Sequence, residues 1–256
     1  MKTKKIELYI HIPFCKSKCR YCDFCSFQAE NAVIDDYITK LKEELIFWGK
    51  KLTKEEVVTV FIGGGTPSYL KEQYIKEICN VIFQYFKVSE NAEITIEANP
   101  GTVDLKKLCT YRESGINRIS FGLQSTIQEE LQYLGRIHTY EQFLQCYNWA
   151  REAGFCNISV DLMSAIPKQT IHSYEKNLRT IAELSPEHIS AYSLIIEEGT
   201  PFYEDENLED LLPSEEDEVR MYQITAQILK EYGYEQYEIS NYAKKDFESR
   251  HNLGYW

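Results

Sequence analysis

The sequence predicts an α/β fold, a partial (β/α)6 barrel of the TIM type, on the basis of two observations. Short β-rich runs alternate with longer amphipathic runs along the first 200 residues. Gly115 and Gly154 directly follow two of the amphipathic runs, as glycines often do at the C-terminal ends of helices. Strands that alternate with helices pair in parallel, so this order favours an open or partial barrel over a sandwich.

The expected elements follow from the period of the apolar residues. In the window 35–48, apolar side chains recur about every 3.6 residues, which predicts a helix. Similar windows predict helices at 73–86, 104–114, 139–153 and 173–184. Runs rich in β-branched and aromatic residues predict strands at 6–12, 57–62, 93–97, 118–122, 158–163 and 188–194.

The character of the chain changes after residue 194. The segment 197–218 is acidic and is broken by Pro201 and Pro213, which predicts a solvated loop, and a helix is expected at 215–231. We therefore expect a core barrel in residues 1–200. Residues 201–256 are expected to hold the acidic loop, the helix and the start of a C-terminal region that is truncated.

Composition limits the class of protein. The 256 residues are 43% hydrophobic, which is enough for one sizeable core. The net charge of −12 argues against broad binding to nucleic acid, which needs a basic surface. No apolar run is long enough to span a membrane, and the short N-terminal apolar run is a poor signal peptide. These features predict a cytoplasmic protein, in which thiols stay reduced and a tight cysteine cluster more often binds metal than forms disulfides.

The cysteine cluster reads C-x3-C-x2-C at Cys15, Cys19 and Cys22. Soft thiolates suit both zinc and iron–sulfur clusters. Structural zinc usually takes four ligands in two separated pairs, and no second pair follows downstream, although Cys25 could be a fourth ligand. Three ligands would leave one iron of a [4Fe–4S] cluster open to a substrate or cofactor. The remaining cysteines are expected to be small buried side chains: Cys79, Cys109, Cys146 and Cys156.

Glycines and polar residues follow the predicted strands. The second strand ends in three glycines, and glycine lets the backbone approach a ligand closely. In α/β folds, ligands bind at the carboxyl ends of the strands. Glu97, Gln124 and Asp161 also lie at or just after the carboxyl ends of predicted strands. We expect them to form the rim of one cavity together with the cysteine loop.

The C-x3-C-x2-C spacing, with Tyr21 before the third cysteine, resembles the radical S-adenosylmethionine (SAM) superfamily. Residues 8–256 resemble one part of it, the oxygen-independent coproporphyrinogen III oxidase family, and within that family the haem chaperone branch. The resemblance implies that Cys15, Cys19 and Cys22 bind a [4Fe–4S] cluster whose fourth iron is chelated by SAM. It is carried by LYIHIPFCKSKCRYCDF, FIGGGTPSYL, ITIEANP, RISFGLQS, LGRIH, VDLMSAIPKQT, YEISNYA and HNLGYW.

The resemblance also implies roles for single residues. Contact with the cluster-bound SAM is implied for Tyr9, Gly64 and Glu97. A second SAM is implied beside Gly65, Thr66, Gln124, Arg136 and Asp161. Tyr9 and Arg136 rest on the resemblance alone, since by itself Arg136 would be read as a surface residue at the start of a helix. Residues 164–167 read SAIP, where the family usually has F-G-L-P. The loss of that glycine is expected to change the conformation of the loop near Asp161 and so bears on the second SAM site.

Two functions stay open. The first is a haem chaperone, which binds haem and passes it to an acceptor protein. The second is the oxidase, a radical enzyme that decarboxylates porphyrinogen propionates, and both readings need an electron donor to the cluster. Phe24 stands where the oxidases have a further cysteine, and only fourteen residues precede Cys15, fewer than in the oxidases. The HNLGYW sequence resembles a haem-linked motif of the chaperone branch, with His251 as the candidate iron ligand. These features favour the chaperone, although the barrel itself does not fix the substrate.

Overall fold

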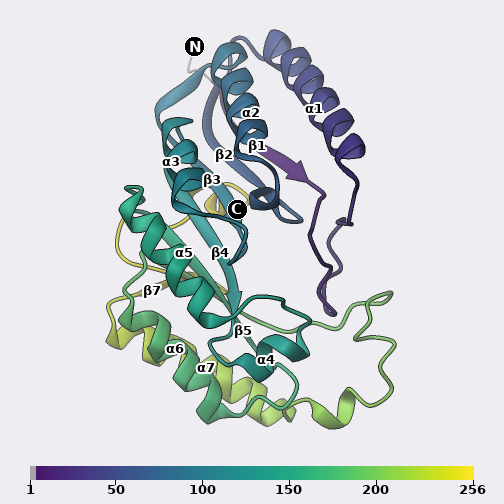
Figure 1. Ribbon diagram of the computed structural model, residues 1–256. Helices are drawn as coiled ribbons and strands as arrows, with labels where there is room; N and C mark the ends of the chain where they lie inside the picture. The colour runs from purple at the N-terminus through teal and green to yellow at the C-terminus, as the bar shows by residue number, and fades with distance from the viewer. Residues whose placement is uncertain (1–3) are drawn as a thin grey trace.

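The computed structural model describes residues 4–256, which form one eight-stranded sheet with the longer helices packed along one face (Figure 1). The strand order is β1-β2-β3-β4-β5-β6-β8-β7, and within the described residues the sheet curves without closing. The first six strands are parallel and confirm the predicted partial barrel: β1 (Lys5–Ile12), β2 (Glu56–Gly64), β3 (Val88–Ala98), β4 (Arg118–Gln124), β5 (Ile158–Ser164) and β6 (His188–Ser193).

The helices lie where the 3.6-residue period predicted them. Two of them begin with capping boxes, at Thr139 and Thr170, in which the threonine hydroxyl accepts a backbone N–H. Gly115 and Gly154 take left-handed backbone angles after their helices, with φ of 90° and 88°. The crossover helices are α1 (Asn31–Lys51), α2 (Glu72–Tyr85), α3 (Leu105–Glu113), α5 (Tyr140–Glu152) and α6 (Ile171–Glu183), with the short α4 (Gln128–Tyr133) before α5.

The last part of the chain adds to the same sheet. Helix α7 (Glu215–Glu231) packs beside α6. Strand β8 (Asn241–Ala243) pairs antiparallel with β6, and β7 (Glu235–Glu238) forms the far edge. The final helix, α8 (Arg250–Leu253), lies against β2. No helix among residues 4–256 is both long enough and apolar enough to cross a membrane.

The two faces of the parallel strands differ in chemistry. Side chains alternate along a strand, so every second residue faces the helices and the others face the inside of the barrel. The helix-facing residues are almost fully buried and apolar, for example Ile62, Ile96, Phe121 and Val160. The inward-facing residues include polar and charged side chains that are also buried, such as Thr59, Glu93, Arg118, Ser159 and His188. The barrel interior is therefore polar.

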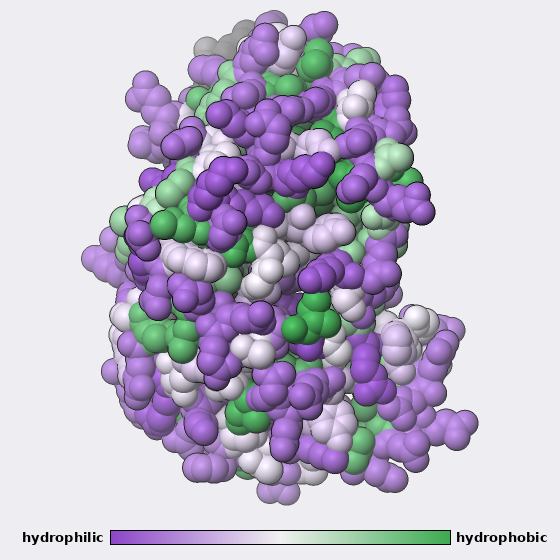
Figure 2. All heavy atoms as spheres, in the orientation of Figure 1, coloured by the Kyte–Doolittle hydropathy of each residue, from purple (hydrophilic) through white to green (hydrophobic). Residues whose placement is uncertain are grey.

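The prediction of a solvated acidic loop is confirmed for most of the segment but misses a few buried side chains. Phe202 is 1% exposed and Leu208 is 3% exposed, and both pack into a second, smaller apolar cluster. The loop keeps its carboxylates in water while its few apolar side chains are buried. Hydrophilic side chains cover most of the face drawn in Figure 2, and the hydrophobic ones there form small separate patches. The other members of the second cluster are Leu134, Met163, Ile166 and Leu194.

The expectation for the four distal cysteines is half right. Cys79 and Cys146 are buried among the helices. Cys109 is only half-buried and Cys156 is exposed, so these two do not serve as core side chains. Cys156 lies in the turn between α5 and β5.

Candidate functional site

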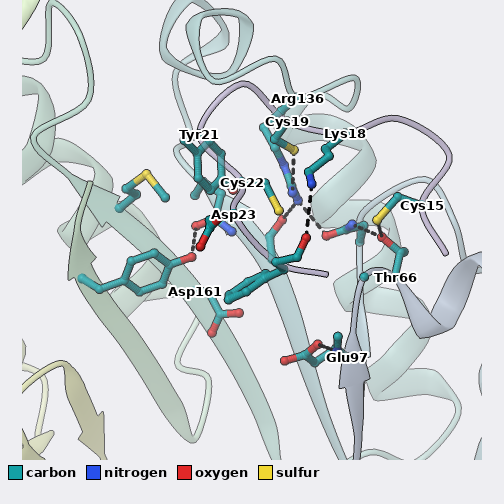
Figure 3. A pocket seen from close by; sticks show the side chains of 18 of the residues that line it. Cys15, Lys18, Cys19, Tyr21, Cys22, Asp23, Thr66, Glu97, Arg136 and Asp161 are labelled. Carbon is teal, nitrogen blue, oxygen red and sulfur yellow. Dashed lines mark hydrogen bonds between the residues drawn. The ribbon is translucent and has the colours of Figure 1, made fainter. Parts of the chain in front are cut away.

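A cavity of about 330 Å³ opens at the carboxyl ends of the parallel strands (Figure 3). Its walls come from the cysteine loop after β1 and from the ends of β2 to β6. This is the edge where the polar strand-end residues were expected to meet. The structure brings these predicted residues together around it: Cys15, Cys19, Cys22, Gly64, Gly65, Thr66, Glu97, Gln124, Arg136 and Asp161.

The cysteine loop, residues 13–29, is closed at its base by backbone hydrogen bonds. The N–H of Cys15 donates to the carbonyl of Phe27 at 3.0 Å, and the N–H of Phe27 donates to the carbonyl of Pro13 at 2.8 Å. Cys15 is buried, and its Sγ lies 3.4 Å from the donating hydroxyl of Thr66. Cys19 and Cys22 are half-buried, while Cys25 is exposed. Three of the four thiols of the loop therefore line the cavity, as the spacing suggested.

The glycines after β2 let the backbone pass close to this loop. A Cβ atom on Gly65 would lie 2.9 Å from the carbonyl oxygen of Phe14 and 3.0 Å from Cys15 Sγ. Gly64 has a φ of 116°, a conformation that side chains with a Cβ rarely adopt. The N–H of Gly65 donates to Ile12 at 2.8 Å, which ties the end of β2 to the end of β1. Larger residues at 64 or 65 would push the loop away from the cavity.

Two carboxyl groups face the cavity from β3 and β5, the strands on either side of β4. Glu97 Oε2 accepts a hydrogen bond from the N–H of Gly64 at 3.0 Å, and Asp161 Oδ1 accepts one from the Ser120 hydroxyl at 3.2 Å. Removal from water raises the pKa of Glu97 to about 8, and the nearby charge of Asp161 adds to this effect. Burial also raises the pKa of Asp161, against the opposing charge of Arg118. A cationic or hydroxyl-bearing ligand would satisfy both carboxylates.

Arg136 reaches the cavity from the turn after α4, so it is not a surface residue. Its Nη2 donates to Asn99 Oδ1 at 2.7 Å and also to the carbonyl of Gly122. Its Nη1 lies 3.6 Å from Cys19 Sγ (Figure 3). The Nε atom is buried and has no hydrogen-bond partner among the described residues. An unpaired buried donor costs free energy, so a ligand that accepts from Arg136 would recover it.

Sequence reasoning missed part of the cavity wall. Asn99, Met163, Tyr192 and Ile195 also line it. The hydroxyl of Tyr192 donates to Gln124 Oε1 at 2.9 Å and so fixes the predicted glutamine. Tyr192 is an inward-facing residue near the end of the sixth strand, and the rule that selected Glu97 and Asp161 could have found it too.

Two predicted residues do not line this cavity. The Tyr9 hydroxyl lies 3.2 Å from His11 Nδ1, and its ring stacks on Phe61 with 6.1 Å between centroids. His251 lies farther toward the amino ends of the strands and is 3% exposed. Its Nδ1 lies 2.7 Å from the Thr59 hydroxyl, and its Nε2 lies 3.2 Å from the Tyr255 hydroxyl.

The donor set of the cavity fits a cluster with a polar cofactor beside it. Three thiols come from a single short loop, glycines leave room next to Cys15, and Arg136 Nε is an unpaired donor. Within residues 4–256, no three His, Cys, Asp or Glu side chains gather closely enough for a single metal ion. A [4Fe–4S] cluster has a different requirement, because each cysteine ligand binds a different iron atom.

Comparison with known proteins agrees with this chemistry. Residues 9–181 match the model of the radical SAM superfamily. The chain is 41% identical to the heme chaperone HemW of Bacillus subtilis (strain 168), covering 97% of this chain and 66% of that protein. It is 38% identical to the heme chaperone HemW of Escherichia coli (strain K12), covering 100% of this chain and 67% of that protein. The chain thus spans about two thirds of the length of these relatives.

A solved structure shares the fold. Coproporphyrinogen III oxidase (HemN) from Escherichia coli, described as a radical SAM enzyme, superposes with a TM-score of 0.88 at 29% identity. The superposition covers 96% of this chain and 57% of that one. The chain belongs to the radical SAM superfamily and, within it, to the family of the heme chaperone HemW.

Proposed function

We propose that this chain binds a [4Fe–4S] cluster, SAM and haem, and that it delivers haem to an acceptor protein in the cytoplasm. The observation that carries the proposal is the cavity, where three thiols of one loop meet an unpaired arginine donor and two desolvated carboxyls. The names of the relatives at 38–41% identity support haem delivery. The acceptor and the electron donor to the cluster are parts of the same proposal.

The residues of the cavity have separate roles in this proposal. Cys15, Cys19 and Cys22 are the cluster ligands. When bound and reduced, the cluster would supply the electron needed to cleave SAM. Gly64 and Glu97 would orient the SAM on the cluster, with Glu97 accepting a hydrogen bond from its amino group, whereas Tyr9 lies outside the cavity wall and would reach the SAM only by turning away from His11. A second SAM would use these groups: Gly65, Thr66, Gln124, Arg136 and Asp161.

The haem site of this proposal is the tail motif at 251–256. His251 is the proposed iron ligand, and the exposed rings of Tyr255 and Trp256 offer apolar surface to a porphyrin. In the present conformation both imidazole nitrogens are within hydrogen-bond distance of hydroxyl groups. Binding of iron by His251 therefore requires one of these contacts to be given up, so the tail must move when haem binds.

A haem titration tests this function. The cluster is reconstituted anaerobically, and haem binding is followed by Soret absorbance for the wild type and for His251→Ala. Exposed His172 provides the matched control, His172→Ala. We expect saturable one-to-one binding that His251→Ala weakens by about tenfold or more, as loss of an iron ligand implies, and that His172→Ala leaves unchanged. Equal binding by both variants would support haem binding but exclude His251 as the iron ligand.

The oxidase activity is the second candidate, and the TM-score of 0.88 with the Escherichia coli enzyme favours it. The test is anaerobic turnover of coproporphyrinogen III with SAM and a reductant. Formation of protoporphyrinogen at a rate that Cys19→Ala abolishes would establish the oxidase. Haem binding without any decarboxylated product would establish the chaperone.

A further inference from the structure

The buried part of the acidic segment lies against the cysteine loop. We call residues 200–208 the strap. In Figure 1 the purple-blue cysteine loop after β1 reaches toward the light-green segment that carries the strap. The contact between them is centred on Arg20, the residue that directly follows Cys19.

Arg20 is held through its backbone and its side chain. Its N–H donates to the carbonyl of Leu134 at 3.0 Å, and its own carbonyl accepts from the N–H of Phe202 at 3.0 Å. Its Nη2 donates to Asp205 Oδ2 at 2.7 Å. The guanidinium carbon also lies 4.8 Å from the centroid of the Phe202 ring. Arg20 thus joins the turn after α4 to the strap.

The partners of Arg20 are themselves fixed. Phe202 and Leu208 are buried in the second apolar cluster, which anchors both ends of the strap. On the other side, Gly135 has a φ of 72°, and a Cβ there would lie 3.0 Å from Arg20 Cγ. A glycine at this position leaves room for the arginine stem. The middle of the cysteine loop is therefore attached to two anchored segments.

The two halves of the cysteine loop are held by different means. Cys15 is fixed by the backbone pairing with Phe27 and by Thr66. Cys19 and Cys22 are half-buried, and Arg20 lies between them in the chain. Apart from the contacts of Arg20, this half of the loop is held by side chains: Arg136 Nη1 lies 3.6 Å from Cys19 Sγ, and His11 Nε2 lies 2.9 Å from the carbonyl oxygen of Cys25. Its own backbone adds the 3.3 Å bond from the N–H of Cys22 to the carbonyl of Cys19, so the Arg20 contacts are the ones that attach it to the strap.

We propose that Arg20 and Asp205 are positioning residues that hold Cys19 and Cys22 in register for the cluster. This inference rests on the proposed function, in which those cysteines are cluster ligands. The side chains of Arg20 and Asp205 are 37% and 26% exposed, so their ion pair adds little to the overall stability of the fold. Its effect is local, and the quantity that reports it is the rate at which the protein loses the cluster.

The test compares Arg20→Gln and Asp205→Asn with the control Glu204→Gln. Glu204 is exposed on the same strap, so the control removes the same charge without touching Arg20. Each reconstituted protein is mixed anaerobically with an iron chelator, and the loss of visible cluster absorbance is timed. We expect Asp205→Asn and Arg20→Gln to lose the cluster about fivefold faster, the factor that loss of one partly exposed ion pair allows, and Glu204→Gln to match the wild type.

Two readouts separate positioning from general destabilisation. The denaturation midpoint of the cluster-free protein should be the same for Asp205→Asn and Glu204→Gln. The double variant Arg20→Gln/Asp205→Asn should lose the cluster no faster than Arg20→Gln alone, because Asp205 acts only through Arg20. Cluster loss from Asp205→Asn at the rate of Glu204→Gln would overturn the inference.

Limited trypsin digestion distinguishes a failed inference from a failed function. If the wild type takes up no iron, the cluster proposal fails, but the strap can still be tested in the cluster-free protein. Trypsin should then cut after Lys16 or Lys18 faster in Asp205→Asn than in Glu204→Gln. Equal cutting rates would show that the ion pair does not hold the loop.

Discussion

The two ends of the barrel interior are built from the same strands but differ in how their polar groups are satisfied. At the carboxyl end, Arg136 Nε has no partner among the described residues, and burial raises the pKa of both Glu97 and Asp161. Toward the amino end, both nitrogens of His251 meet hydroxyl groups. Glu93 there accepts from the N–H groups of Arg250 and His251 at 3.1 and 3.2 Å.

This difference indicates where in the barrel a ligand binds. A buried polar group without a partner destabilises the fold, so unpaired groups mark positions where a bound molecule can supply hydrogen bonds. The amino end already receives these bonds from α8. Thr95 Oγ1 and Arg118 Nε, farther inside the barrel, also lack partners among residues 4–256. The unpaired groups thus include side chains deeper than the cavity wall.

The largest effect should come from the thiols at the carboxyl end. Replacing Cys19 by Ala should leave essentially no cluster, because a cubane held by two protein ligands is readily lost. Iron and sulfide content after reconstitution is the measurement. Cys25→Ala is the control, since Cys25 is exposed and outside the cavity wall. An equal loss of iron in both variants would place Cys25 among the ligands.

The next effect should come from the unpaired arginine. Arg136→Gln removes charged donors from the cavity and should weaken SAM binding by roughly 10- to 100-fold, the range expected for a hydrogen bond to a charged group. Calorimetric titration of the reconstituted protein measures it. Arg220→Gln, at an exposed position on α7, should bind SAM like the wild type. If Arg136→Gln bound SAM with unchanged affinity, Arg136 would not be part of the SAM site.

The third effect concerns pH. The folded protein raises the pKa of Glu97 from 4.5 to about 8, so between these values the folded state holds a proton that the unfolded state has lost. The free energy of unfolding of the cluster-free protein should therefore fall as pH rises, by at most about 1.4 kcal/mol per pH unit from this group. Glu97→Gln should remove that part of the slope. Urea denaturation at pH 5, 6, 7 and 8 measures it, and parallel curves would contradict the raised pKa.

The smallest effect is expected at the amino end of the barrel interior, where the polar groups of His251 and Glu93 already have hydrogen-bond partners. Thr59→Val removes the hydroxyl beside His251 Nδ1 and should lower the free energy of unfolding by about 1 kcal/mol. SAM affinity should stay the same, because Thr59 does not line the cavity. Thr39→Val, on the exposed face of α1, is the control for the substitution itself. A change in SAM affinity with Thr59→Val would mean that the two ends are coupled.

The sequence was informative where a feature is local. The 3.6-residue period located the main helices to within a few residues, and strand ends located Glu97, Gln124 and Asp161. Helix α4 has six residues and β8 has three, too few for a period to appear. The positions of Arg136 and Phe202 depend on how distant loops pack against the cysteine loop, and no local pattern encodes that.

The closed base of the cysteine loop has a consequence for cluster assembly. Hydrogen bonds between Cys15, Phe27 and Pro13 bring the ends of the loop together within the protein chain itself. The conformational entropy of closing this loop is thus lost when the barrel folds, and not when iron arrives. Incoming iron and sulfide then meet thiols at a high local concentration. Loss of the cluster should correspondingly loosen the middle of the loop and leave the barrel folded. The cluster can then be removed and rebuilt without unfolding the protein.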